Sequence, residues 1–139
     1  MDWTAWDHSL ETGNAAMDSE HRKLATLLEG LRKAAEHGSD KARCARPLDE
    51  LIAHAEAHFA LELRFMNEQR YPKLRQHVDE HAMLLCQARD YRANFDIESA
   101  AGRAALMRFP EVWLEFHILF SDKDLGQFLA RGVGGRARR

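Results

Sequence analysis

The sequence predicts an all-α protein: an antiparallel, up-down-up-down four-helix bundle with an irregular N-terminal arm and a short C-terminal helix. Three observations support this prediction. Four successive segments place apolar residues at helical spacing, only three prolines interrupt the 139 residues, and no segment shows the alternation of a half-buried strand. Amphipathic helices joined by short connections are typical of antiparallel bundles.

The first two helices are expected over residues 18–37 and from Asp40 or Pro47 to about residue 68. Asp18 is placed to cap the first helix, because a short carboxylate can accept hydrogen bonds from the free N–H groups of a first turn. The apolar stripe of the first helix consists of Leu24, Leu27, Leu28 and Leu31, and that of the second includes Leu48, Leu51, Ile52, Ala55 and Phe59.

The third helix is expected to begin at Tyr71 and Pro72, since proline suits the first helical position, and to end near residue 95. The fourth covers about residues 97–120, where Pro110 should kink or restart the helix. The inward apolar residues are Leu74, Val78, Leu85 and Ala88 in the third helix and Leu106, Phe109, Trp113 and Phe120 in the fourth.

The rest of the chain completes a single domain. A short helix is expected over residues 124–131, and residues 132–139 are expected to form a flexible basic tail. The bundle domain therefore covers residues 1–131. A chain of 139 residues, 45% of them hydrophobic, can bury one core and has little room for a second.

Charge and apolar content exclude several classes of protein. The formal net charge is −2, which argues against nucleic acid or an anionic membrane as the main partner. No run of apolar residues is long enough to span a membrane. The N-terminal residues lack the basic start and apolar run of a secretion signal, and Cys44 and Cys86 are interpreted as reduced thiols. Together these features predict a cytoplasmic protein.

The apolar stripes contain polar residues that a buried face should avoid. An unpaired buried polar group costs roughly 1–3 kcal/mol, and a buried charge costs more. Five histidines and one carboxylate nevertheless face inward, and every one of the four helices contributes. They are His21, His58, Glu62, His77, His81 and His117.

A shared metal would explain this cluster. One buried histidine is usually satisfied by a hydrogen bond, but five packed together would leave ring nitrogens unpaired, and neutral imidazole is a good ligand for iron, zinc, copper or nickel. The pairs His77–His81 and His58–Glu62 are each four residues apart, which is one helical turn. Five imidazoles exceed what one ion needs from a protein, whereas two ions bridged by carboxylates would use them all.

Glu62 is one candidate bridge, and the second should come from the fourth helix. Asp122 and Asp124 both follow His117 there. Seven residues return to the same face of an ideal helix, which slightly favours Asp124, whereas five residues turn by about 140°. Periodicity alone therefore cannot choose Asp122 over Asp124.

These residues stand in motifs that resemble those of the bacterial hemerythrins. The resemblance covers most of the chain, from Trp3 to about Leu129. Its motifs are one histidine, then HxxxE, HxxxH and HxxxxD. In this sequence they lie in Met17-Asp18-Ser19-Glu20-His21-Arg22-Lys23-Leu24, in His58-Phe59-Ala60-Leu61-Glu62, in Tyr71-Pro72 with His77 and His81, and in Trp113-Leu114-Glu115-Phe116-His117-Ile118 with Asp122.

The resemblance implies a non-haem di-iron centre in a four-helix bundle. Its motif selects Asp122 as the second bridge beside Glu62, with an oxo or hydroxo group as the third. One iron would be held by His77, His81 and His117, and the other by His21 and His58. The second iron would keep an open position for dioxygen, and Leu24, Trp113, Leu114 and Ile118 would form the apolar oxygen pocket that excludes water.

The implied function is reversible binding of dioxygen for storage, delivery or scavenging, not enzymatic turnover. A di-iron enzyme acting on peroxide or nitric oxide stays open, as does an oxygen or redox sensor that acts through a redox or acceptor partner. Di-iron oxidases use more carboxylates and Glu-x-x-His pairs, and no glutamate here stands three residues before a histidine. His54 replaces an aromatic residue of the family and is either partly exposed or a hydrogen-bonding neighbour of the site.

Overall fold

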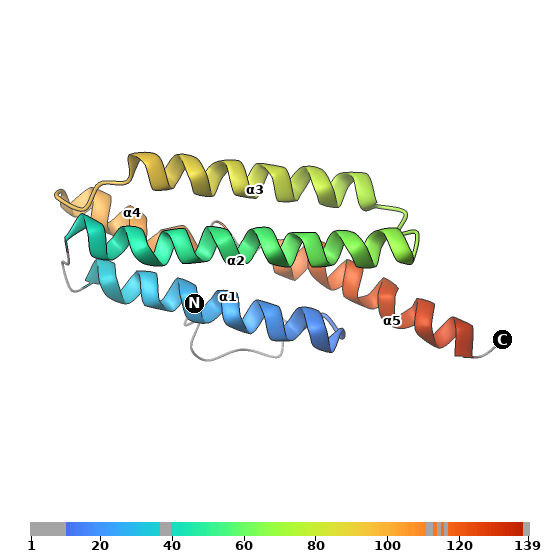
Figure 1. Ribbon diagram of the computed structural model, residues 1–139. Helices are drawn as coiled ribbons and strands as arrows, with labels where there is room; N and C mark the ends of the chain where they lie inside the picture. The colour runs from blue at the N-terminus through green and yellow to red at the C-terminus, as the bar shows by residue number, and fades with distance from the viewer. Residues whose placement is uncertain (1–10, 37–39, 111–112, 114, 116, 138–139) are drawn as a thin grey trace.

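The computed structural model describes residues 11–36, 40–110, 113, 115 and 117–137. Within these residues all regular secondary structure is helical, and the predicted fold class is confirmed (Figure 1). The elements are α1 (Ala15–Glu36), α2 (Lys41–Glu68), α3 (Leu74–Asn94), α4 (Ala100–Pro110), the π-helical stretch η3 (His117–Asp122) and α5 (Lys123–Ala137). The arm before residue 11 lies outside the described residues.

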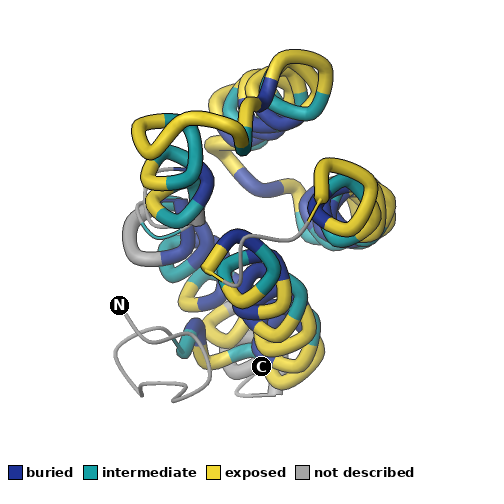
Figure 2. The backbone as a smooth tube through the Cα atoms, turned by 90° about the vertical axis from the view of Figure 1, so that its left-hand side faces the viewer, coloured by how far each residue is buried: buried dark blue, intermediate teal, exposed yellow. Residues whose placement is uncertain are grey.

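Consecutive helices run in opposite directions and are joined at alternate ends (Figure 1). Helix α1 packs against α2 and α4, and α2 packs against α3. Helix α4, which ends at Pro110, together with η3 and α5 forms the fourth helical segment of the bundle. The buried stretches face the inside of the bundle and the exposed ones face outward (Figure 2). Among the described helices, none combines the length and the apolar content that crossing a bilayer requires.

The beginning of α1 corrects one expectation. Asn14, not Asp18, caps this helix: its side-chain oxygen accepts a hydrogen bond from the Met17 N–H at 3.0 Å. The Asp18 carboxylate instead accepts hydrogen bonds from the backbone N–H and the hydroxyl of Thr12, at 2.7 and 2.8 Å. Asp18 therefore holds the preceding segment against the first turn of the helix.

The start of α2 depends on a side-chain cap, whereas α3 begins after Lys73 without one. The Asp40 side chain accepts a hydrogen bond from the Arg43 N–H at 2.9 Å, so α2 begins there and passes through Pro47 without restarting. Helix α3 begins two residues after Pro72, and α4 begins at Ala100, three residues later than expected.

The C-terminal helix is longer than the sequence predicts. Helix α5 follows η3 directly and continues to Ala137, through residues assigned above to a flexible tail. Each glycine in that segment lowers helix propensity by only about 1 kcal/mol, and no proline interrupts it. The glycines therefore weaken the helix without ending it.

Three apolar clusters form the core of the described residues, and two of them lie on either side of the inward polar residues. One cluster consists of Leu24, Ala25, Leu28, Leu51, Ala55, Phe59, Leu84, Ala88, Trp113 and Ile118. The other consists of Met17, Met66, Tyr71, Leu125 and Leu129. Along α1 and α2 the polar residues come between members of these two clusters, and Asp122 comes between Ile118 and Leu125, so the bundle holds a polar layer between two apolar ones.

Candidate metal centre

All five histidines and both carboxylates of the expected ligand set meet in this polar layer. Their exposed fractions lie between 0 and 7%. Ligand atoms from these residues form two groups, within each of which the atoms lie no more than 4.8 Å apart. The first group is Glu62, His77, His81, His117 and Asp122, and the second is His21, His58, Glu62 and Asp122. The two groups share both carboxylates.

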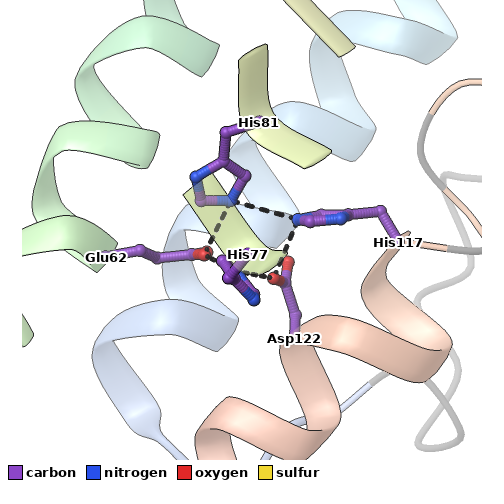
Figure 3. Close-up of side chains that lie close together, drawn as sticks. All are labelled: Glu62, His77, His81, His117 and Asp122. Carbon is purple, nitrogen blue, oxygen red and sulfur yellow. Dashed lines mark hydrogen bonds and ion pairs between the residues drawn. The ribbon is translucent and has the colours of Figure 1, made fainter. Parts of the chain in front are cut away.

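The first group brings three imidazole Nε2 atoms together between α2, α3 and η3 (Figure 3). Glu62 Oε1 lies 2.7 Å from the Nε2 of His77 and 3.1 Å from that of His81. Asp122 Oδ1 lies 3.0 Å from the Nε2 atoms of both His77 and His117. The Nε2 atoms of His81 and His117 are themselves 3.1 Å apart.

The second group uses the other oxygen of each carboxylate. Glu62 Oε2 lies 2.5 Å from the Nε2 of His58 and 3.6 Å from that of His21. Asp122 Oδ2 lies 2.8 Å from the Nε2 of His21. Each carboxylate therefore turns one oxygen toward each group of histidines, which is the arrangement of a bridging ligand.

The donor atoms also require positive charge between them. Both oxygens of Asp122 lie within ion-pair distance of histidine nitrogens. Two buried carboxylates are expensive unless cations compensate them. Protons on the imidazoles or metal ions can supply that charge, and the residues present suit a metal held by nitrogen and oxygen.

The pKa values show how the metal-free cluster would be balanced. Burial disfavours charge on His21 and His77, but hydrogen bonds to Asp122 and Glu62 outweigh it and raise the pKa of both to about 9. Burial likewise opposes charge on His117, whose pKa rises to about 10 because of Asp122 and Glu80.

The pKa values of three other groups of the cluster, His81, Glu62 and Asp122, are lowered. Burial, together with the neighbouring imidazoles, lowers the pKa of His81. Burial opposes charge on Glu62, yet hydrogen bonds from four histidines hold its pKa well below its ordinary value. The pKa of Asp122 is also lowered, because His117 and His21 outweigh burial and the repulsion from Glu62.

The π-helical backbone explains how Asp122 reaches the site. In a π-helix each N–H bonds to the carbonyl five residues earlier, so residues five apart stand about one turn from each other. Asp122 ends η3, which His117 begins, and both side chains face the cluster (Figure 3). Asp124 lies outside the cluster and pairs with Lys73 at the surface. The structure thus places Asp122, and not Asp124, at the shared position.

Three of the four residues expected to line an oxygen pocket are buried beside the cluster. Leu24 and Ile118 are fully buried, and Trp113 donates a hydrogen bond from its indole N–H to the Leu84 carbonyl at 2.8 Å. Leu114 lies outside the described residues. Phe59 stacks on His81 with ring centroids 3.8 Å apart, and this contact covers one face of the imidazole.

Two polar contacts involve residues outside the cluster of ligand atoms. His54 lies half-buried, and its Nε2 is 3.0 Å from Glu20 Oε2 on α1, but it belongs to neither group of ligand atoms. Glu80 contacts His117 Nδ1 at 2.9 Å and was not singled out from the sequence. Its position between His77 and His81 on one helix is the only signal that could have drawn attention to it.

Comparisons with known proteins agree with this geometry. Residues 12–129 match the family described as the hemerythrin HHE cation binding domain. The chain is 35% identical over 133 residues to a bacteriohemerythrin of Ralstonia nicotianae, covering 94% of this chain and 93% of that protein. It is 28% identical over 120 residues to a bacteriohemerythrin of Pseudomonas aeruginosa, with 84% of this chain and 75% of that protein covered.

A solved structure shares the fold. The crystal structure of a protein described as a leucine-to-phenylalanine mutant superposes with a TM-score of 0.78 at 26% sequence identity. The match covers 93% of this chain and 98% of the other.

Proposed function

Because this chain belongs to the hemerythrin HHE cation-binding family, we propose that its polar layer holds two iron ions and binds dioxygen reversibly. The observation that supports this most directly is the sharing of Glu62 and Asp122 between two groups of histidines. A single ion would leave one group without a partner. Two ions bridged by both carboxylates would use every donor atom.

The proposed ligands follow from the distances. His77, His81 and His117 would hold one iron, and His21 and His58 the other, with Glu62 and Asp122 across the pair. A solvent-derived oxo or hydroxo group would complete the bridge. The second iron has fewer protein ligands, and it would therefore be the one that keeps a position open for a small molecule.

Iron is favoured over other metals by the family and by the function proposed. Imidazole and carboxylate suit zinc and copper as well, so the donor set alone does not select the metal. The relatives named above are bacteriohemerythrins. When bound, a ferrous pair supplies the two electrons that reversible capture of dioxygen requires, which zinc cannot supply.

The chain's own residues would protect this chemistry from water. Leu24, Trp113 and Ile118 are 0–2% exposed and belong to the apolar cluster that borders the site. An apolar border admits a small neutral molecule but disfavours water and the protons that water delivers. Leu114 is proposed to complete this border. The role of these residues is thus to prolong the oxygenated state and not to transform a substrate.

The proposed setting is the cytoplasm, where both cysteines would stay reduced. Cys44 is buried, Cys86 is exposed, and both are free. A redox or acceptor partner would return the protein to its ferrous state.

The test begins with the chain loaded with Fe²⁺ under argon. We expect about two irons per chain and visible absorption that appears on adding oxygen and disappears on returning to argon. The zinc-loaded chain is the matched control, and it should show no such change. A native ion content of one zinc, or turnover of peroxide or nitric oxide without a reversible spectrum, would refute the proposal.

A further inference from the structure

Glu80 connects two turns of the π-helical stretch to α3. Its Oε2 atom lies 2.9 Å from His117 Nδ1, and the Ser121 hydroxyl donates a hydrogen bond to the same oxygen at 2.5 Å. His117 begins η3, and Ser121 immediately precedes Asp122 at its end. One carboxylate oxygen thus contacts two residues, about one turn apart, of the segment that provides two members of the cluster.

The contact with His117 determines how that ring is presented. An imidazole whose Nδ1–H donates to a carboxylate has its Nε2 directed away from it and available as a ligand. Here Nε2 faces inward, 3.0 Å from Asp122 Oδ1 and 3.1 Å from His81 Nε2. Glu80 therefore fixes both the rotation of the ring and the nitrogen that faces the cluster.

The contact with Ser121 helps to hold the π-helical backbone of η3. π-helical turns are rare and less favourable than α-helical ones, so they persist where surrounding contacts hold them. A return of η3 to α-helical geometry would move Asp122 about 140° around the helix from His117. A carboxylate that holds Ser121 and His117 at once opposes this change.

We propose that Glu80 is a positioning residue that holds His117 and the π-helical register of η3 so that His117 and Asp122 both face the metal pair. The inference rests on the proposed metal centre but not on its reaction with dioxygen. Glu80 itself lies outside the cluster of ligand atoms.

The position of Glu80 makes it suitable for substitution. Its side chain is 39% exposed and borders a surface cavity of about 180 Å³ that it shares with Tyr71, Lys73, Gln76, His77, Ser121 and Asp124. Replacement there leaves no void in the apolar core. The neighbouring Asp79 is exposed, and it provides a matched control on the same helix.

The experiment measures binding of Fe²⁺ alone under argon, by competition with a ferrous chelator. We expect Glu80→Ala to weaken iron binding about 10–100-fold, the usual effect of removing a group that orients a metal ligand. Glu80→Gln should restore binding to within about threefold of the unaltered chain, because its amide oxygen can still accept both hydrogen bonds. Asp79→Ala should bind iron as the unaltered chain does.

Proton NMR of the metal-free protein provides a second readout. The His117 Nδ1–H should be protected from exchange with solvent in the unaltered chain and in Glu80→Gln. In Glu80→Ala this protection should be lost. This measurement separates the inference from the proposed function, since neither it nor iron binding uses oxygen. A chain that binds iron but no oxygen would refute only the function.

Three results would overturn the positioning role. Iron binding by Glu80→Ala that equals that of the unaltered chain would do so, as would an equal loss in Asp79→Ala. If Glu80→Gln bound iron as weakly as Glu80→Ala, the effect would come from the negative charge of Glu80 and not from its hydrogen bonds. That result would contradict the positioning role.

Discussion

Replacing Asp122 by alanine should remove metal from the site and destabilise the metal-free protein. The carboxylate is 1% exposed and lies within 3.0 Å of histidine nitrogens from α1, α3 and η3. Asp124→Ala is the matched control. Its carboxylate is 43% exposed and pairs with Lys73, whose side chain is 58% exposed.

The size of the effect follows from burial. Removing one partner of a buried ion pair costs about 3–5 kcal/mol, although histidines that lose Asp122 can shed their protons and recover part of this. We expect Asp122→Ala to lower the free energy of unfolding by about 2–4 kcal/mol at pH 7, which for a chain of this size is roughly 6–15 °C in Tm. The exposed pair of Asp124 should contribute at most about 1 kcal/mol.

The assays are iron analysis after anaerobic loading and thermal unfolding of the metal-free proteins. Asp122→Ala should lose most of its iron, and Asp124→Ala should keep both ions. Equal iron contents in the two variants would show that Asp122 is no bridging ligand. Equal Tm values would show that the buried contacts of Asp122 contribute nothing to the fold.

Three further predictions concern stability and the surroundings of the site. Gly126→Ala should destabilise the chain by about 1–3 kcal/mol in urea unfolding, because a Cβ there would lie 2.4 Å from the Thr12 carbonyl oxygen. Gly30→Ala, where a Cβ meets nothing within 4 Å, should stabilise it by about 0.5–1 kcal/mol, and the same sign for both variants would contradict this reasoning. Below pH 6.5, the metal-free fold should have the full benefit of the three histidines whose pKa rises to about 9–10, and it should lose that benefit as pH rises toward those values. The two buried carboxylates stabilise the fold above their ordinary pKa values of 3.8 and 4.5. Urea unfolding should therefore show the greatest stability between about pH 4.5 and 6.5. A free energy of unfolding that rises from pH 7 to pH 9 would contradict this linkage. His54→Tyr, which breaks the contact with Glu20, should keep both irons but change the autoxidation rate followed by visible absorption, and an unchanged rate would remove His54 from the oxygen chemistry.

The order and direction of the helices could be predicted because apolar spacing and burial coincide. Leu24, Leu28 and Leu31 stand at helical spacing in the sequence, and all three are fully buried. Helix ends were less predictable, since they depend on which of several polar residues caps the helix. Asn14 and Asp18 are both good capping residues, and only the contact with Thr12 shows that Asp18 is occupied elsewhere.

The choice between Asp122 and Asp124 could not be made from periodicity, because an argument from periodicity assumes α-helical geometry throughout the segment. The change from α-helix to π-helix over His117–Asp122 alters the number of residues per turn, and no residue type in that segment predicts this change. The family resemblance supplied the choice that spacing could not. Glu80 escaped notice for another reason: a glutamate on a polar helix face is ordinary until a histidine from another helix is seen beside it.

The polar layer between the two apolar clusters also couples metal binding to completion of the fold. Its first and last members, His21 and Asp122, are separated by roughly a hundred residues of chain. A partly synthesised polypeptide can offer isolated imidazoles, but it has no complete set of donors until its last helix docks. Complete binding of the ions therefore requires the closed bundle, and metal binding and closure of the bundle stabilise each other.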